Sequence, residues 1–491
     1  MRRVLIQRLQ EGVAKRLGNK IMAALADGSD EEIIRMTNYW ERLAVVEDHK
    51  AGARGLREII EKGHPIGKWL KRLSAQLSPA SRKGFVVNVF ANSMFVGEEK
   101  RLAFRDREGF RPPDLIVFSV TSRCNLNCRG CWAREYRDTT ADLSWDVIDR
   151  TITEAKERFG LHFFTIAGGE PFMRPDMLDL YAKHNDCWFL IYTNGTLVTK
   201  DVAKRLAKLG NTGPMLSVEG LEEETDARRG KGIFRKLEKT AKMLRDEGVV
   251  VGFSATATRH NVEVVSSAEF IDTMLDWGAL IGWYFQYIPI GDRPDTSLML
   301  TPQQRDFLRR SVDGQRAAKP IFLADFWNDG TAVDGCMAGG KRYLHINNNG
   351  DIEPCVFCHF AVDNIYDTTV TEALKSPFFR AIRERIPYDG NLLRCCMLID
   401  RPQVFREHYQ RFHPRPTHKG AESLVTDLAE ALDSNRDGVS AILDKAWAEG
   451  DWQHILSGKI EKEERQKRAA ADRAMPAATG PGASTGEAPA S

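Results

Sequence analysis

Residues 113–132 read PDLIVFSVTSRCNLNCRGCW, and this stretch contains the two features that decide the expected fold. The first feature is the apolar run Leu115 to Val120, which is rich in β-branched and aromatic residues and predicts a buried strand. The second is a loop directly after it that carries Cys124, Cys128 and Cys131. A strand followed by a thiol-rich loop predicts a metal centre at the carboxyl end of that strand.

Similar β-rich runs recur along the chain, and helical patterns separate them. The runs lie at 163–167, 188–192, 215–218, 249–255 and 283–288, and amphipathic segments lie at 144–159, 200–209 and 232–247. This alternation predicts parallel strands with right-handed crossover connections. We therefore expect an α/β fold built on a partial (β/α)6 TIM-like barrel over residues 113–325, with an open doubly wound sheet as the alternative.

The segments on either side of this array have different patterns. Residues 1–112 read as a helical N-terminal extension, and residues 326–415 read as a small, turn-rich domain that holds five late cysteines. Residues 416–474 return to a helical pattern. Residues 475–491 are rich in Ala, Pro, Gly and Ser, which predicts a disordered tail.

The composition and the first residues of the chain bear on its partners and its location. Of 491 residues, 42% are hydrophobic and 28% are charged, and 70 basic residues nearly balance 68 acidic ones. Neither nucleic acid nor an acidic partner is indicated by this balance. The opening MRRVLIQRLQ lacks the apolar stretch and the cleavage site of a secretory signal. We expect a cytoplasmic protein with reduced thiols.

The spacing Cys124-x3-Cys128-x2-Cys131 suits a particular metal centre. Three thiolates on a tight loop can hold three irons of a [4Fe-4S] cluster and leave the fourth iron open to another ligand. The alternative is a zinc knuckle completed by a distant residue, although zinc sites usually pair their cysteines as C-x2-C.

This cysteine loop, at the end of the first strand of a β/α array, resembles the radical S-adenosylmethionine (SAM) superfamily. The resemblance covers residues 113–325. It implies an enzyme in which the open iron binds the amino and carboxylate groups of SAM, and reductive cleavage of SAM gives a 5′-deoxyadenosyl radical that abstracts a substrate hydrogen. One departure stands out, because the residue before the third cysteine is commonly aromatic in the family but is Gly130 here, and Trp132 follows Cys131.

Further motifs strengthen the resemblance. Gly168, Gly169, Glu170 and Pro171 resemble the family's GGEP motif, which implies contacts to the SAM ammonium group. The resemblance assigns other parts of SAM to later strand ends: Asn194 near the methionine moiety, Ser217 and Glu219 at the ribose, Arg229 at the carboxylate, and residues 286–289 at the adenine.

The late cysteines form a second pattern. Thirteen residues separate Cys336 from Gly350, and four more separate Gly350 from Cys355, with NNNGD as a turn between two expected strands. This layout resembles the SPASM extension or its shorter twitch form. It implies an auxiliary [4Fe-4S] cluster, with Cys358 and one of the adjacent Cys395 and Cys396 completing the ligands; a zinc site in the same hairpin is the alternative.

The substrate is the least determined part of the prediction. We expect a radical SAM enzyme that modifies a peptide or protein and takes electrons from a flavodoxin or ferredoxin; a small-molecule substrate stays open. A second hypothesis is a lipid acyl chain, because residues 65–83 form a basic amphipathic stretch that would contact an anionic membrane through Trp69. Alternatively, Trp69, Leu70 and Leu73 pack on the barrel. A non-catalytic iron–sulfur or zinc protein is the third hypothesis.

Overall fold

The computed structural model describes residues 30–43, 47–138, 142–291 and 294–452. The sequence-based expectations for residues 1–29, for helix at 453–474 and for a disordered tail at 475–491 therefore lie outside the described residues.

A ten-stranded sheet forms the centre of the molecule, in the order β11-β9-β8-β1-β2-β3-β4-β5-β6-β7. Consecutive strands from β1 to β7 pair in parallel, which confirms the expected α/β barrel-like array. Because β7 and β11 are the two ends of this order, the barrel is partial. The strands are β1 (Leu115–Ser119), β2 (Phe163–Ala167), β3 (Trp188–Thr193), β4 (Thr212–Val218), β5 (Gly252–Ala257), β6 (Ile281–Gln286) and β7 (Phe322–Asp325).

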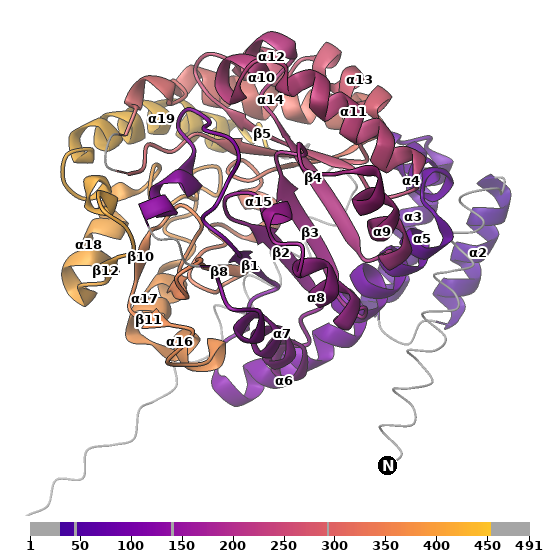
Figure 1. Ribbon diagram of the computed structural model, residues 1–491, viewed down its shortest axis with the longest axis horizontal. Coiled ribbons are helices and arrows are strands. Elements are labelled where there is room, and N and C mark those ends of the chain that lie inside the picture. The colour runs from indigo at the N-terminus through magenta and orange to yellow at the C-terminus, as the bar shows by residue number, and fades with distance from the viewer. Residues whose placement is uncertain (1–29, 44–46, 139–141, 292–293, 453–491) are drawn as a thin grey trace, which may run out of the picture.

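Helices cover the outer face of this curved sheet (Figure 1). Local sequence sets their ends: α14 begins after Thr301, whose side chain forms a capping box with Gln304, and α7, α9 and α13 end at the left-handed glycines Gly160, Gly210 and Gly278. The helices are α7 (Trp145–Phe159), α8 (Met177–Lys183), α9 (Lys200–Leu209), α10 (Glu222–Arg229), α11 (Ile233–Asp246), α12 (Val262–Val265), α13 (Ala268–Trp277) and α14 (Pro302–Ala318).

The late cysteine region joins the same sheet. β8 (Tyr343–Ile346) pairs in parallel with β1, and β9 (Asp351–Glu353) and β11 (Asp363–Asn364) follow in antiparallel pairing. The turn predicted at NNNGD lies between β8 and β9. The expected boundary at residues 325/326 thus falls within one continuous sheet, and the division into a core and an auxiliary domain stays a prediction.

The rest of the C-terminal region packs around this hairpin, on the side of the molecule opposite the N-terminal helices α2 to α5 (Figure 1). Asn391 Nδ2 donates to the Leu443 carbonyl over 3.1 Å, so the helix Ala429–Glu449 holds the loop that precedes Cys395. The elements are α15 (Gly330–Val333), α16 (Val370–Lys375), α17 (Pro377–Arg385), α18 (Pro402–Phe412), α19 (Ala429–Glu449) and a two-stranded sheet of β10 (Phe360–Ala361) and β12 (Arg415–Pro416).

The N-terminal extension is helical where it is described, and its basic amphipathic helix α4 (Pro65–Gln76) lies on the barrel. Trp69 is only 8% exposed, and its Nε1 donates to the Leu280 carbonyl over 2.6 Å. Arg72 donates to the Pro320 carbonyl over 2.8 Å, and Leu73 is fully buried. The exposed Trp69 face on which the membrane hypothesis depends is therefore absent, because that face packs on the core.

The other N-terminal elements are α2 (Asp30–Leu43), α3 (Glu47–Glu61), α5 (Pro79–Gly84), the π-helical segment η1 (Phe85–Val96) and α6 (Gly97–Glu108). Within the described ranges, no helix is both long enough and apolar enough to cross a bilayer.

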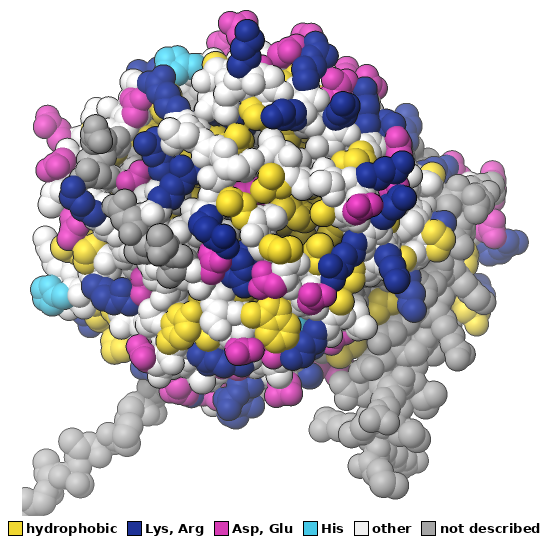
Figure 2. Space-filling view, in the orientation of Figure 1, with side chains coloured by type: hydrophobic (Ala, Val, Ile, Leu, Met, Phe, Trp, Pro, Cys, Tyr) yellow, Lys and Arg dark blue, Asp and Glu magenta, His cyan; other side chains and the backbone are white. Residues whose placement is uncertain are grey.

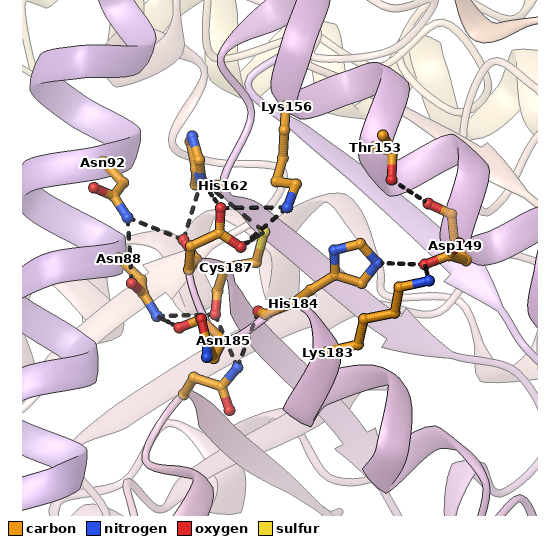
Figure 3. Close-up of polar contacts among 12 residues, drawn as sticks. Asn88, Asn92, Asp149, Thr153, Lys156, His162, Lys183, His184, Asn185 and Cys187 are labelled. Carbon is orange, nitrogen blue, oxygen red and sulfur yellow. Dashed lines mark hydrogen bonds and ion pairs between the residues drawn. The ribbon is translucent and has the colours of Figure 1, made fainter.

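A buried polar cluster ties η1 to the amino ends of β2 and β3 (Figure 3). Asn88 donates to the Cys187 carbonyl and Asn92 to the Asp186 carbonyl, each over 3.0 Å. His162 Nδ1 also lies 3.0 Å from the Asp186 carbonyl oxygen. These bonds satisfy backbone groups that would otherwise be buried without partners, so they fix the extension against the barrel.

Candidate active site

The predicted site residues meet at the carboxyl ends of the strands, around a cavity of about 180 Å³. All three cysteines of the first group line it, together with residues from strands that are distant from them in sequence. Those that match the sequence prediction are Gly168, Gly169, Asn194, Ser217, Arg229, Gln286, Tyr287 and Ile288. On the face drawn in Figure 2, hydrophobic side chains gather near the centre and charged ones surround them.

Backbone and side-chain bonds fix the cysteine loop. Arg228 donates from Nε to the Arg129 carbonyl over 3.1 Å and from Nη2 to the Gly130 carbonyl over 3.3 Å. On the other side of the loop, Asn194 Nδ2 donates to Asn125 Oδ1 over 2.9 Å and lies 3.7 Å from Cys124 Sγ. The loop is therefore held from α10 and from the end of β3.

Gly130 has a steric reason for its departure from the family pattern. Its φ is +64°, and a Cβ there would lie 2.7 Å from the Tyr287 ring. A larger side chain would be strained and would collide with that ring. The aromatic residue of the loop is instead Trp132, which lines the cavity.

The glycine pair of the GGEP motif lies against the cysteine loop. A Cβ on Gly168 would lie 2.4 Å from the Thr121 carbonyl oxygen, and one on Gly169 would lie 2.1 Å from the Arg123 carbonyl oxygen. The amide of Gly169 donates to Thr121 and that of Glu170 donates to Arg123. The glycines therefore permit two loops to approach closely, a role that the sequence did not reveal.

Glu170, whose carboxylate is predicted to meet the SAM ammonium group, has protein partners in this structure. It is fully buried and does not line the cavity. Its oxygens accept hydrogen bonds from Thr193 Oγ1 and the Asn194 amide, both over 2.7 Å, and Pro171 begins the 3₁₀ turn that follows. Burial raises the pKa of Glu170, and these bonds oppose the rise. Glu170 therefore fixes the turn that presents Asn194.

Glu219, predicted at the ribose of SAM, is not among the residues that line the cavity. It is fully buried. Its carboxylate forms an ion pair with Arg228 Nη1 at 2.6 Å and accepts a hydrogen bond from Arg229 Nε over 2.8 Å. Arg229 Nη1 in turn lies 3.9 Å from Cys128 Sγ. Glu219 thus orients two arginines beside the cysteines. The sequence prediction missed Arg228. Its position directly before Arg229 was the feature that could have indicated it.

Two thiols of this site, those of Cys124 and Cys128, are protonated at neutral pH unless a metal binds. Burial raises the pKa of both Cys124 and Cys128, and the charge of Arg229 partly opposes this for Cys128. Metal binding would therefore release protons here.

The spacing of the thiols bears on which metal centre fits. Three thiolates around one zinc ion, with Zn–S bonds of about 2.3 Å, place their sulfurs about 3.8 Å apart. Within the described part of the chain, only His162, Asp186 and Cys187 bring three ligand atoms within 4.8 Å of one another. Neither cysteine group does so, which favours multi-iron clusters over the zinc alternatives.

The His162, Asp186 and Cys187 group itself is satisfied without a metal ion. Lys156 Nζ lies 3.0 and 3.2 Å from the two Asp186 carboxylate oxygens (Figure 3). His162 Nδ1 is bonded to a backbone carbonyl, as described above.

The late cysteines surround a second cavity, of about 20 Å³. Cys336, Cys355, Cys395 and Cys396 line it, and Cys358 is fully buried outside the lining. The structure thus groups both adjacent cysteines with Cys336 and Cys355, where the sequence predicted only one of them and included Cys358.

A buried ion pair supports the two adjacent cysteines. Arg305 Nη2 lies 3.0 Å from Asp400 Oδ2, which accepts the Cys396 amide over 2.9 Å. Arg305 also donates to the Leu393 carbonyl over 3.1 Å, so α14 braces the loop on both sides of Cys395.

The two cavities share one wall. Ile288, Phe326, Met337, Tyr343 and Phe357 line both of them. A ligand in the larger cavity would therefore be separated from the late cysteines by a single layer of side chains.

Comparison with known families agrees with this geometry. The model of the Radical SAM superfamily matches residues 118–272, and the model of the SPASM iron–sulfur cluster-binding domain matches residues 336–397. These matches support an iron–sulfur cluster with SAM at the first site and auxiliary iron–sulfur chemistry at the second.

The alignments with three curated relatives cover most of the length of each relative. The mycofactocin maturase MftC of Mycolicibacterium smegmatis is 30% identical over 309 residues, covering 58% of this chain and 76% of the relative. The AdoMet-dependent heme synthase of Oleidesulfovibrio alaskensis is 26% identical over 317 residues, covering 57% and 79%. The PqqA peptide cyclase of Gluconobacter oxydans is 25% identical over 286 residues, covering 55% and 79%.

Among solved structures, Streptococcus suis SuiB bound to the precursor peptide SuiA aligns with a TM-score of 0.51 at 20% identity, covering 67% of this chain and 79% of that one. At this identity the alignment supports the fold alone. The family matches and the similarity to the mycofactocin maturase show that this chain is a radical SAM enzyme with a SPASM domain.

Proposed function

We propose that this radical SAM enzyme abstracts hydrogen from a side chain of a peptide or protein. The observation that carries the proposal is the part of the larger cavity's wall that the barrel strands form. Aromatic residues such as Tyr192, Trp283 and Phe285 alternate there with small hydroxyl residues such as Ser254 and Thr256. None of the lining residues from β1 to β6 is charged. Such a wall suits an uncharged side chain on a hydrogen-bonding backbone.

We assign the first site by what each residue touches. Cys124, Cys128 and Cys131 would hold a [4Fe-4S] cluster, and Asn194, Ser217 and Arg229 would contact SAM. When bound, this pair supplies hydrogen-atom abstraction. The chain's own part is to hold the reactants in a cavity of limited volume, with Glu170 and Glu219 fixing the groups that contact them.

We assign the second site to Cys336, Cys355, Cys395 and Cys396, because these four line the smaller cavity. Cys358 would then be a buried partner of the hairpin rather than a ligand. We further propose a flavodoxin or ferredoxin as electron donor, on the ground that the family's reductive chemistry needs one.

The relatives support the peptide class and raise one rival. Two of them are a peptide cyclase and a maturase, and SuiB was solved with a precursor peptide. The heme synthase suggests an iron porphyrin instead. A porphyrin carries carboxylates that need cations. The arginines that line the cavity are Arg137, Arg228 and Arg229, and each is already bonded inside the protein.

Deuterium transfer tests the substrate class without a known substrate. Cells would be grown either on deuterated amino acids or on deuterated fatty acids, and their peptide and lipid fractions would be given to the reconstituted enzyme with SAM and reductant. We expect deuterium in the 5′-deoxyadenosine product only with the labelled peptide fraction, and none with the Cys128→Ala variant. Deuterium from the lipid fraction alone would refute the proposal.

A further inference from the structure

One buried carboxylate joins the two cysteine regions. Glu353 is fully buried and accepts hydrogen bonds from four side chains. Tyr136 donates from its hydroxyl over 2.9 Å, His345 from Nδ1 over 2.6 Å, Asn347 from Nδ2 over 3.0 Å and Thr417 from Oγ1 over 2.6 Å. A buried charge with this many partners holds all of them in one arrangement.

The partners come from segments that are distant in sequence. Tyr136 belongs to the 3₁₀ segment η2 (Trp132–Asp138), which follows directly after Cys131. Glu353 ends β9, in the hairpin that continues to Cys355 and Cys358. The carboxylate thus connects the loop of the first site to the hairpin of the second site over 217 residues of sequence.

Aromatic packing reinforces the same connection. The ring of Trp132 lies 5.7 Å from that of His345, 6.2 Å from that of Phe357 and 6.1 Å from that of His359, measured between centroids. Phe357 and His359 flank Cys358. Because Trp132 follows Cys131 directly, any shift of the hairpin would press on the last residue of the first cysteine group.

We propose that Glu353 is a positioning residue for the first site: it transmits the order of the late hairpin to the Cys124–Cys131 loop, so that tight SAM binding requires an intact hairpin. This proposal depends on SAM binding at the first site but not on the class of substrate. A wrong substrate class would therefore leave this proposal unaffected, and failure of this proposal would leave the proposed substrate class unaffected.

The main test is the affinity of the reconstituted protein for SAM, measured by equilibrium dialysis with radiolabelled SAM. Glu353→Gln keeps the shape of the side chain but removes its charge and one acceptor. We expect the SAM dissociation constant to rise about tenfold, with iron content unchanged, because the loop loses charge-assisted hydrogen bonds. Glu372→Gln, the same change on the exposed face of α16, is the matched control and should leave affinity unchanged.

Two further readouts separate positioning from general stability. Hydrogen exchange should speed up in residues 122–138 as well as in the hairpin, and the SAM-induced change in the EPR signal of the first site should weaken. Tyr136→Phe and Thr417→Val each delete one donor and should give smaller effects in the same direction, which keeps the proposal testable if Glu353→Gln does not fold. Unchanged SAM affinity in all three variants, or faster exchange confined to residues 343–361, would overturn it.

Discussion

The hydroxyl of Tyr343 donates a hydrogen bond to Cys355 Sγ over 2.8 Å, and the same residue lines the cavity that contains the first cysteine group. Tyr343 stands on β8, which pairs with β1, the strand that leads to Cys124. One side chain therefore contacts both the proposed substrate cavity and a proposed ligand of the auxiliary cluster.

This contact predicts a redox effect of Tyr343→Phe. A hydrogen bond to a ligating sulfur stabilises the more negative, reduced state of a cluster. The variant should therefore have an auxiliary-cluster midpoint potential more negative than that of the wild type, measured by potentiometric EPR titration. The first-site potential serves as an internal reference, and Tyr366→Phe, at an exposed tyrosine, serves as a control. An unchanged auxiliary potential would mean that Cys355 is not a ligand.

Cys128→Ala should abolish formation of 5′-deoxyadenosine from SAM in reconstituted protein, because the first cluster would lose one of its three ligands. Product is measured by chromatography after anaerobic incubation with dithionite. Cys187→Ala is the matched control, since this cysteine lies at the opposite end of the barrel strands from the cavity, and it should retain wild-type product formation. Normal turnover by Cys128→Ala would refute the site assignment.

The triple variant Cys124/Cys128/Cys131→Ala should still bind about four irons per chain, held by the late cysteines. Iron and zinc are measured by elemental analysis after reconstitution. Adding Cys336→Ala and Cys355→Ala should remove this remaining iron. Zinc in place of iron in the triple variant would show that the late site has a structural metal instead.

His162 should make the protein sensitive to acid. Its pKa is lowered from 6.5 to about 4, mainly by burial; Asp186 opposes this shift, and the charges of Lys156 and Lys100 add to it. Between these two pH values the unfolded chain binds a proton that the folded chain does not, so stability falls as pH falls through this window. At pH 5 the loss is about 2 kcal/mol relative to pH 7. Urea unfolding at both pH values should show a smaller loss for His162→Gln, and an equal loss would contradict the assignment.

Trp69→Ala should lower the free energy of unfolding by about 3–5 kcal/mol, because it removes a buried ring and its bond to the Leu280 carbonyl. Lys68→Ala, an exposed position on the same helix, should change it by less than about 0.5 kcal/mol. Denaturant unfolding checks both. Unchanged stability together with lost binding to anionic vesicles would restore the membrane hypothesis.

The sequence by itself determined the features that depend on local pattern. The alternation of β-rich runs with amphipathic segments placed β1 to β6 and the main helices between them, because period and composition decide which residues form strands or helices. It also predicted that most residues of the first site lie close together, since the carboxyl ends of parallel strands meet at one end of a barrel. The turn at NNNGD followed from its residue types in the same way.

Only the tertiary structure decided which buried groups meet. Trp69 bonds to a carbonyl 211 residues away and Tyr136 to a carboxylate 217 residues away, and no local pattern encodes such partners. The same holds for Glu170 and Glu219, whose motifs suggested ligand contacts but whose carboxylates are used by neighbouring turns and arginines. Periodicity shows that a side chain is buried, whereas its partner is set by how distant elements pack.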